Sequence, residues 1–515
     1  MWPRMFVRSV LALALAAQAA GADPLDLIQL RQEVRAWRTA HEKEVVGELS
    51  GLLALPNVAA DRADIRRNAD HLLEMLRRRG FQARLLTAGD SPPAVYGELS
   101  APGAKRTVVF YAHYDGQPAD PEDWGGNDPW KPVLRTGAPG PDTKDVDLAS
   151  APAPLNPEWR LYARSASDDK GPIEAMLAAL DALKAAGVKP SVNIKMLLEG
   201  EEEDGSPHLT SILEAHRDVL EADAWILGDG PVHQTRRMQV VFGARGVMGL
   251  EVTAYGPARA LHSGHYGNWA PNPAALLVEL LAGLRGPNGE IRIAGFEDDL
   301  RPLSESEKAA SAAMPFVEDA LRQELAVGWT EGGDERLQDR VMRPALNIRG
   351  LQCAQVGKGA RNAIPTEATA SIDFRLVPDQ TPEKVRERTD AYVRSLGFHV
   401  VHDVPDLETR RTHAKVVRLN WDDGYAAART SLDLPVSRAV VRTIEAMQGG
   451  PVIQVPMLGG SVPMSMFTDT LKVPVIIVPI VNHDNNQHAA HENLRLQNLW
   501  DGIETFAALF AGLDW

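Results

Sequence analysis

The stretch Leu198–Ser206 most constrains how this chain can fold, because it places four adjacent carboxylates, Glu201 to Asp204, directly after a predicted strand. Residues 192–198, which precede it, are mostly apolar, as is typical of a short buried strand. Adjacent carboxylates repel one another, and their burial is costly unless positive charge lies among them. Most acidic runs are solvated loops, so this stretch by itself favours an exposed loop.

Three other stretches place similar residues after apolar runs or at a helix start. One predicted strand ends in His113-Tyr114-Asp115, and residues i and i+2 of a strand share a face, so both side chains point into one cleft. A predicted helix start contains Asp168-Asp169, whereas helix capping needs only one such acid. The loop 482–493 carries three histidines and two acids. Each stretch taken singly also fits an ordinary polar loop or helix cap.

A fifth stretch of this kind is the apolar run 224–228, which is followed directly by Asp229. Ligand sites in α/β sheets gather outside the carboxyl ends of strands. Histidine, aspartate and glutamate are ligands that divalent metals prefer. The sequence therefore predicts an α/β fold with a metal site at one edge of its sheet.

As a set, these motifs resemble the dinuclear-metal exopeptidase family that includes carnosinases, aminoacylases, glutamate carboxypeptidase and succinyl-diaminopimelate desuccinylase. The resemblance is closest to the carnosinase and nonspecific dipeptidase branch. It implies a catalytic α/β domain, with a mixed, mostly parallel sheet flanked by helices, and an inserted α+β lid that also dimerises. The matching blocks lie in the family's order, at 111–115, 168–172, 198–203, 261–264 and 374–378.

The resemblance also implies which residues bind metal and which act on the substrate. The implied ligands are His113 for one ion, His488 for the other, Asp168 as the bridge, and Asp229 and Glu203 to complete the two sites. Two neighbouring divalent ions need such a bridging carboxylate. Zinc is the first choice of metal, and manganese and cobalt are compatible with the same ligands.

Glu202 is implied as the general base of hydrolysis by a metal-bridged hydroxide, and Asp115 is implied to orient His113. Because Glu201, Glu202 and Glu203 are adjacent, a shift of one residue would exchange base and ligand. The family's equivalent of the Asp168–Asp169 peptide bond is cis, so the same is expected here.

The segment 240–427 is predicted to form the lid, a four-stranded antiparallel sheet with two helices over one face and a helical stretch from Ser304 to Leu325. In the resembled family a lid histidine, here His262, reaches the partner subunit's active site and stabilises the oxyanion. Without the resemblance, His262 would be interpreted as a capping or packing residue. The resemblance also implies that Arg375, Gly460 and Ser461 bind the terminal carboxylate of a peptide. The guanidinium group of arginine suits this task, because it can donate two hydrogen bonds to one carboxylate.

Three positions depart from the family pattern and bear on the substrate more than on the reaction. His491 stands in the final motif where an asparagine is usual. Asn362, taken as substrate-binding, replaces an expected hydroxyl residue. A histidine expected near 420–422 is absent.

Length and charge limit the remaining possibilities. At 515 residues the chain suits two domains, and a net charge of −15 argues against nucleic acid or an anionic membrane as a partner. The single cysteine, Cys353, lies in an apolar strand pattern and is predicted to be packed. Residues 136–157, rich in proline, alanine and glycine, are predicted to form a surface loop.

The N-terminus is typical of a signal peptide over residues 1–22, with two arginines, a short apolar run and small residues at the cleavage position. This predicts an exported, periplasmic protein. The predicted catalytic domain then comprises residues 23–239 and 428–515.

These features predict a metal-dependent exopeptidase that hydrolyses dipeptides or short peptides. An aminoacylase or an N-carbamoyl amino acid amidohydrolase would use the same metals and remains an alternative. A non-catalytic periplasmic peptide- or metal-binding protein is an alternative of another class. The presence of Glu202 beside a complete set of five ligands argues against that last alternative.

Overall fold

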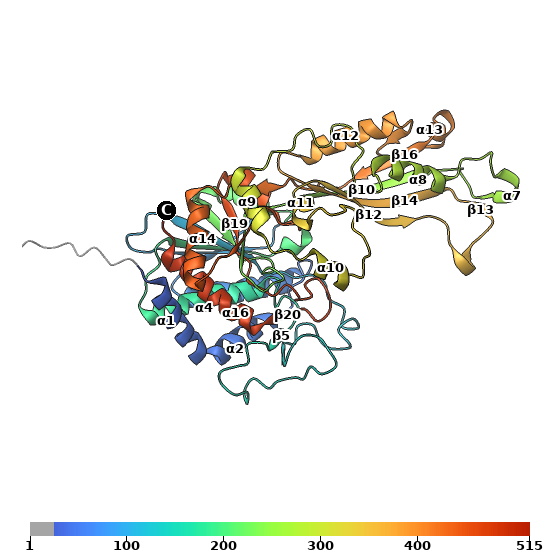
Figure 1. The fold of residues 1–515 in the computed structure, drawn as a ribbon. Helices are drawn as coiled ribbons and strands as arrows, with labels where there is room; N and C mark the ends of the chain where they lie inside the picture. Colours follow the sequence, from blue (N-terminus) through green and yellow to red (C-terminus); the bar gives the residue numbers. More distant parts are fainter. Residues whose placement is uncertain (1–24) are drawn as a thin grey trace, which may run out of the picture.

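The computed structural model describes residues 25–515, so the predicted signal peptide at 1–22 lies outside the described residues. In Figure 1 a larger body, which contains both ends of the described chain, continues into an elongated lid. None of the helices within residues 25–515 has the length and apolar character needed to span a membrane.

The larger body is built on an eight-stranded sheet with the order β1-β2-β6-β3-β7-β19-β8-β18. The central strands β6, β3, β7 and β19 run parallel, β1 and β2 are antiparallel neighbours at one edge, and β8 and β18 form a parallel pair at the other. The predicted mixed, mostly parallel sheet is therefore confirmed. Its strands are β1 (Gln82–Leu86), β2 (Ala94–Leu99), β3 (Thr107–His113), β6 (Asn193–Glu199), β7 (Ala224–Leu227), β8 (Gln239–Val241), β18 (Ile453–Val455) and β19 (Val475–Ile477).

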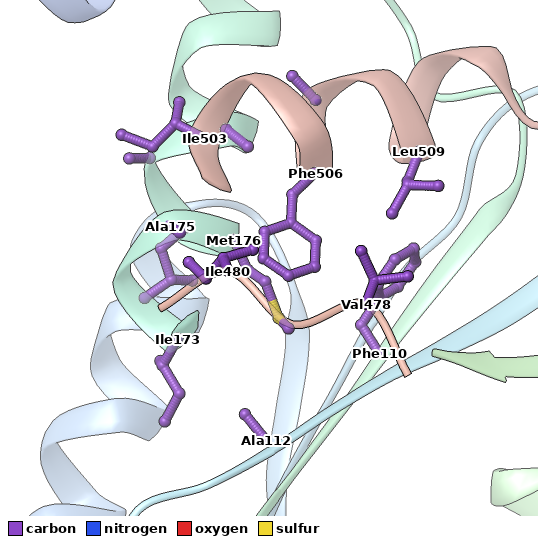
Figure 2. Packing of buried hydrophobic residues seen from close by; sticks show 14 of the residues in the cluster. Phe110, Ala112, Ile173, Ala175, Met176, Val478, Ile480, Ile503, Phe506 and Leu509 are labelled. Atoms are coloured by element: carbon purple, nitrogen blue, oxygen red, sulfur yellow. The ribbon is translucent and has the colours of Figure 1, made fainter. Parts of the chain in front are cut away.

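Helices cover this sheet because its central strands are apolar on both faces. Phe110 of β3 packs edge-to-face against Phe506 and Phe510 of α16 (Leu496–Gly512), and Figure 2 shows Met176 of α4 (Lys170–Ala186) beside the same rings. The helices α1, α2, α3 and α14 complete this side of the core. Their bounds are α1 (Leu27–Ala40), α2 (Glu42–Leu53), α3 (Arg62–Arg78) and α14 (Pro435–Gln448).

The opposite face of the sheet is covered by α5 (Leu209–Ala215) and α15 (Met464–Leu471), with the short α6 (Arg217–Leu220) alongside. Phe467 of α15 packs within 5.0 Å of the rings of Tyr111 and Trp225, on neighbouring strands. The body is thus a sheet between two helical layers, the α/β architecture in which strand ends are free to carry a site.

The lid contains a five-stranded sheet rather than the predicted four-stranded one, with the order β12-β14-β10-β16-β15. The additional strand, β15 (His399–Val401), pairs parallel to β16 (Val416–Trp421), because the chain crosses back through α13 (Leu407–Thr412) between them; α12 (Pro382–Ser395) connects β14 (Glu367–Leu376) to β15. The helices α8 (Pro273–Leu284) and α12 cover one face, as predicted. The remaining strands are β10 (Gly246–Tyr255) and β12 (Ala345–Gln352).

The stretch 304–325 forms two helices, α9 (Glu305–Ala313) and α10 (Glu318–Glu324), so the prediction of one continuous helix was wrong. Pro315 explains the break, because a residue before proline is displaced from helical geometry, and Met314 is extended with ψ 143°. A third short helix, α11 (Leu337–Val341), follows. In Figure 1, α10 and α11 lie where the larger body meets the lid.

Two further details concern the lid and its connections. Cys353 is exposed, so its predicted packing was wrong; β12 ends one residue before it, at the open edge of the sheet. The chain passes from the larger sheet to the lid after β8, and β9 (Gly243–Ala244) pairs with β17 (Ala428–Arg429) where it returns.

The loop 136–157 follows β4 (Val133–Arg135) and lies against α2. Its Leu155 amide donates to the Glu42 carboxylate at 2.5 Å, and Lys43 donates to the Ala149 carbonyl at 3.0 Å.

Candidate metal centre

The candidate centre forms at the carboxyl ends of three parallel strands. His113 is the last residue of β3 and lies opposite Glu199, the last residue of β6. Asp229 follows the end of β7, on the other side of β3. Parallel strands bring their carboxyl ends to the same edge, so the sheet itself places His113, the acidic loop after Glu199 and Asp229 side by side.

A small three-stranded sheet brings the other two loops to this edge. β5 (Arg160–Tyr162) pairs with β20 (Asn493–Arg495), so the loop after β5, which contains Asp168, lies against the loop before β20, which contains His488. The Asp168–Asp169 peptide bond is cis, as expected. Gly171 is required here, because a Cβ atom would lie 2.5 Å from the Ala166 carbonyl oxygen.

The five predicted ligands fall into two groups that share Asp168. His113, Asp168 and Asp229 offer ligand atoms within 4.8 Å of one another, and so do Asp168, Glu203 and His488. Oδ1 of Asp168 lies 2.9 Å from Nε2 of His113, and Oδ2 lies 3.0 Å from Nε2 of His488. The two oxygens of one carboxylate therefore face two different groups, which is the arrangement of a bridging ligand.

Carboxylates outnumber the two histidines in the ligand groups, so the site carries an excess of negative charge. Burial and the neighbouring Asp168 raise the pKa of Asp229 to about 7, and burial raises the pKa of Glu202 well above its usual value. Hydrogen bonds to Asp168 and Glu203 raise the pKa of His488 to about 10. Such a cluster attracts cations, and its nitrogen and oxygen donors suit a pair of divalent ions.

Asp115 holds the acidic loop and His113 together. Its carboxylate accepts the backbone N–H groups of Glu202 at 3.1 Å and Glu203 at 3.0 Å, and it lies 3.4 Å from Nδ1 of His113. Burial alone would lower the pKa of His113, but hydrogen bonds to Asp115 and Asp168 outweigh it and raise that pKa. Asp115 thus orients an imidazole whose other nitrogen faces the candidate metal position.

The positions of Glu201, Glu202 and Glu203 bear on which of these adjacent residues is a ligand and which is the base. Glu203 lies 3.0 Å from His488, within one ligand group. Glu202 lies 4.0 Å from Nε2 of His113 and belongs to neither group. Glu201 points elsewhere and accepts the ring N–H of His208 at 2.9 Å. Glu202 is therefore the carboxylate that remains free to exchange a proton beside the ligands.

Glu492 is a functional candidate that sequence reasoning did not single out. Its fully buried carboxylate accepts the backbone N–H groups of Ser165, Ser167 and Asp168 at 2.9–3.0 Å. It also accepts the Ser167 hydroxyl and pairs with Arg164 at 2.8 Å. One carboxylate thus shapes the Asp168 loop from a position four residues after His488. The sequence signal was an acid following the histidine at the end of an otherwise polar loop.

A second cluster joins the lid to the larger body. Arg375 of β14 donates to the Ser461 hydroxyl at 2.8 Å and to Asp373 at 2.8 Å, and the Gly460 carbonyl accepts the Arg245 amide. Tyr425, which sequence reasoning missed, lies near this cluster, and burial together with the charge of Glu202 raises its pKa. Arg375, Gly460 and Ser461 are thus brought together where the lid meets the larger body.

His262 and Asn362 lie elsewhere, at the tip of the lid. His262 ends β11 (Leu261–His262), which pairs with β13 (Ala363–Ile364), and the Asn362 carbonyl accepts the Ser263 amide at 3.0 Å. Figure 1 shows α7 (Ser263–Tyr266), the adjacent helix, at the end of the lid farthest from the larger body. These two predicted substrate contacts are therefore not gathered with the metal ligands of the same chain.

The departures from the expected motifs have structural counterparts. His491 adopts a positive φ of 61° and its ring lies 5.7 Å from that of buried Trp124, away from both ligand groups. Gly424 lies two residues after the stretch 420–422 in which the histidine is absent; it has φ 66°, and a Cβ there would lie 2.5 Å from the Val247 carbonyl oxygen. No side chain fits at Gly424 without displacing this backbone.

Comparisons with known proteins agree with this geometry. The model of "Peptidase family M20/M25/M40" matches residues 109–511. The "Cys-Gly metallodipeptidase dug1" of Schizosaccharomyces pombe is 27% identical over 480 residues, covering 90% of this chain and 94% of the relative. The human "Beta-Ala-His dipeptidase" is 28% identical, covering 81% and 77%. An M20 family metallo-carboxypeptidase, Sso-CP2 from Sulfolobus solfataricus, superposes with a TM-score of 0.74 at 26% identity, covering 91% of this chain and 98% of that structure.

Proposed function

This chain belongs to peptidase family M20/M25/M40, and we propose that it is a dinuclear metal-dependent dipeptidase. The observation that carries the proposal is the carboxylate of Asp168, whose two oxygens face His113 and His488 at 2.9 and 3.0 Å, with Glu202 beside them. The similar relatives that are named for Cys-Gly and β-Ala-His dipeptides support the substrate class.

The proposed ligands are His113, Asp168 and Asp229 for one ion and Asp168, Glu203 and His488 for the other. When bound, the two ions supply Lewis-acid activation of water and of the scissile carbonyl. Zinc is the proposed metal, because histidine and carboxylate ligands suit it, and manganese or cobalt fit the same donors.

Glu202 is proposed as the general base. Its carboxylate lies 4.0 Å from Nε2 of His113 and belongs to neither ligand group, so it is available to accept a proton beside the ligands. It accepts a proton from the attacking water and returns it to the leaving amine nitrogen. Asp115 contributes by holding both the Glu202 backbone and the His113 ring in place.

Arg375, Ser461 and Gly460 are proposed to bind the free carboxylate of the substrate. Arg375 donates to Asp373 from Nε, and its Nη1 points to the Ser461 hydroxyl, so a guanidinium edge and a hydroxyl converge on one position. A site that requires a terminal carboxylate favours exopeptidase action on dipeptides over cleavage within a long chain.

His262 is proposed to act in the active site of a partner subunit, in a dimer formed through the lid. The Gly264 amide donates to Nδ1 of the exposed His262 at 3.1 Å, so Nδ1 is the acceptor and the proton of the neutral ring lies on Nε2. An outward N–H donor is what a developing oxyanion requires. Asn362 lies beside it and is proposed to contact the same substrate.

Export to the periplasm after removal of residues 1–22 remains a proposal from the sequence pattern alone. Comparison of the mature N-terminus and of cell fractions would test it, and a full-length cytoplasmic protein would contradict it.

The function is tested by amino acid release from dipeptides, N-acetyl, N-succinyl and N-carbamoyl amino acids, using the mature protein loaded with zinc or manganese. We expect hydrolysis of dipeptides. Glu202→Gln is expected to lower kcat by about 10²–10⁴-fold and to retain two metal ions per chain. Activity restricted to N-acyl or N-carbamoyl substrates would reassign the substrate class, and unchanged turnover by Glu202→Gln would refute its role as the base.

A further inference from the structure

A cavity of about 370 Å³ lies between the larger body and the segment that contains α10 and α11. One wall is formed by Met314, Val317 and Val341 of that segment. The opposite wall is formed by Met457 and Leu458, which follow β18. Most of the side chains named here are apolar, so the cavity suits an uncharged apolar group.

The remaining walls continue directly from the metal-binding loops. Val232 and His233 lie three and four residues after Asp229, and His483 lies five residues before His488. The Val232 amide donates to the Val481 carbonyl at 2.8 Å, which holds these two loops against each other. The cavity is therefore bounded by the same loops that present two of the proposed metal ligands.

The cavity also adjoins the proposed carboxylate-binding loop. Gly459 lines the cavity, and Gly460 and Ser461 follow it in the chain. A Cβ at Gly459 would lie 3.3 Å from Val341, so the loop packs closely on α11. In a dipeptide the C-terminal carboxylate and the side chain of that residue are attached to one carbon atom. A pocket for this side chain must therefore lie close to the carboxylate site, and this cavity is lined by the residue directly before Gly460 and Ser461.

We propose that this cavity receives the side chain of the C-terminal residue of the substrate and selects apolar side chains such as those of leucine, methionine and phenylalanine. The inference rests on the proposed dipeptidase function and adds a substrate class to it. It also distinguishes this chain from relatives that are named for dipeptides ending in glycine or histidine.

The charged residues on the cavity wall are already engaged, which favours apolar over charged side chains. Arg336 donates to the carbonyl oxygens of Ser311, Met314 and Pro315 and lies 3.7 Å from Glu318. Glu318 accepts the backbone N–H groups of Val317 and Leu337. A charged substrate side chain would lose water without gaining an ionic partner from Arg336 or Glu318.

The test compares kcat/KM of the metal-loaded enzyme for Ala-Leu, Ala-Phe, Ala-Gly, Ala-His, Ala-Lys and Ala-Asp, which share one N-terminal residue. We expect Ala-Leu and Ala-Phe to exceed Ala-Gly and both charged substrates by about tenfold or more, the range that hydrophobic pockets provide. Equal values across the panel would overturn the pocket assignment and leave the dipeptidase function intact. Hydrolysis of none of them would overturn both.

Val317→Trp fills the cavity and is expected to lower the Ala-Leu to Ala-Gly ratio of kcat/KM by about tenfold. Phe316→Trp is the matched control, because Phe316 is the adjacent residue, is 63% exposed and does not line the cavity. A ratio that is equally unchanged in both variants would overturn the proposal.

Val317→Asp provides a second test that does not depend on tolerance of a larger side chain. A carboxylate on the cavity wall is expected to raise kcat/KM for Ala-Lys relative to Ala-Leu by about tenfold or more, because it supplies the missing ionic partner. An unchanged Ala-Lys to Ala-Leu ratio in a folded Val317→Asp protein would argue against side-chain entry into this cavity.

Discussion

The metal-binding edge of the eight-stranded sheet and the tip of the lid hold their polar side chains in opposite ways. At the edge, His113 and Asp115 are fully buried and Asp168 is 6% exposed, and each contacts several other polar groups. At the tip, His262 is exposed; its ring accepts the Gly264 amide and lies beside the His265 ring.

This difference in burial is consistent with different functions, metal binding at the edge and contact with a second subunit at the tip. Ligands for paired metal ions must be held within a fraction of an ångström, which requires buried loops with many hydrogen bonds. A residue that serves a second site must instead project from its own subunit. The edge therefore gathers both candidate ligand groups within one chain, whereas the proposed role of His262 at the tip depends on a partner subunit.

Of the variants that compare the tip with the edge, His262→Ala is expected to have the largest effect, and it tests whether the exposed tip is catalytic at all. Loss of a single oxyanion donor lowers kcat by about 10²–10³-fold, and the metal content should remain that of the wild type because no ligand changes. Steady-state kinetics and metal analysis measure both. Wild-type turnover would show that the tip has no part in the reaction.

Mixed dimers decide whether His262 acts within its own subunit or across the interface. After subunit exchange between His262→Ala and Glu202→Gln proteins, a mixed dimer contains one site with wild-type Glu202 and wild-type His262 only if the histidine crosses. We expect activity to reappear on mixing. Two inactive proteins that stay inactive after proven exchange would exclude the cross-subunit arrangement.

A pH-dependent stability is expected at the edge because Glu199, at the end of β6, is buried and accepts the Tyr111 hydroxyl at 2.6 Å. Burial raises its pKa from 4.5 to about 7. Between these pH values the folded protein keeps a proton that the unfolded chain releases, so stability falls as pH rises from 4.5 to 7. The loss is on the order of 3 kcal/mol.

Glu199→Gln should remove this part of the pH dependence. Denaturant unfolding of chelator-treated protein at pH 4.5, 6 and 8 measures it, and the same exchange at exposed Glu74 controls for the loss of one carboxylate. If the free energy of unfolding of Glu199→Gln changed with pH as it does in the wild type, Glu199 would be charged in the folded state.

A smaller effect is expected for Glu492→Gln, which tests whether the ordered Asp168 loop matters for metal binding. The amide would present a donor to backbone N–H groups that now meet a carboxylate, and comparable changes around metal ligands weaken binding by about 10–100-fold. Calorimetric titration with zinc measures this. Asp484→Asn is the matched control. Asp484 lies in the same loop as Glu492, but its ion pair is with Arg160 of β5 and not with residues 164–168. Equal metal affinity in both variants would make Glu492 a structural residue only.

The strand-end pattern of apolar runs followed by acids or histidines predicted a metal site, and the family resemblance supplied the five ligands. His113 and Asp229 directly follow apolar runs, and the structure places both at one edge of the sheet. Glu492 and Tyr425 were missed because each acts through partners that are distant in the chain. The helix expected over 304–325 was wrong because Pro315 outweighs the helical pattern around it.

The sequence by itself determined the α/β class, the family and the five residue types that gather at the sheet edge, because these depend on local apolar periodicity and on short motifs. Only the tertiary structure decided which oxygen of Asp168 faces which histidine, that Asn362 lies at the lid tip, and that a cavity adjoins Gly459. These features depend on contacts between segments far apart in the chain, and such contacts exist only after the sheets, helices and loops have packed together.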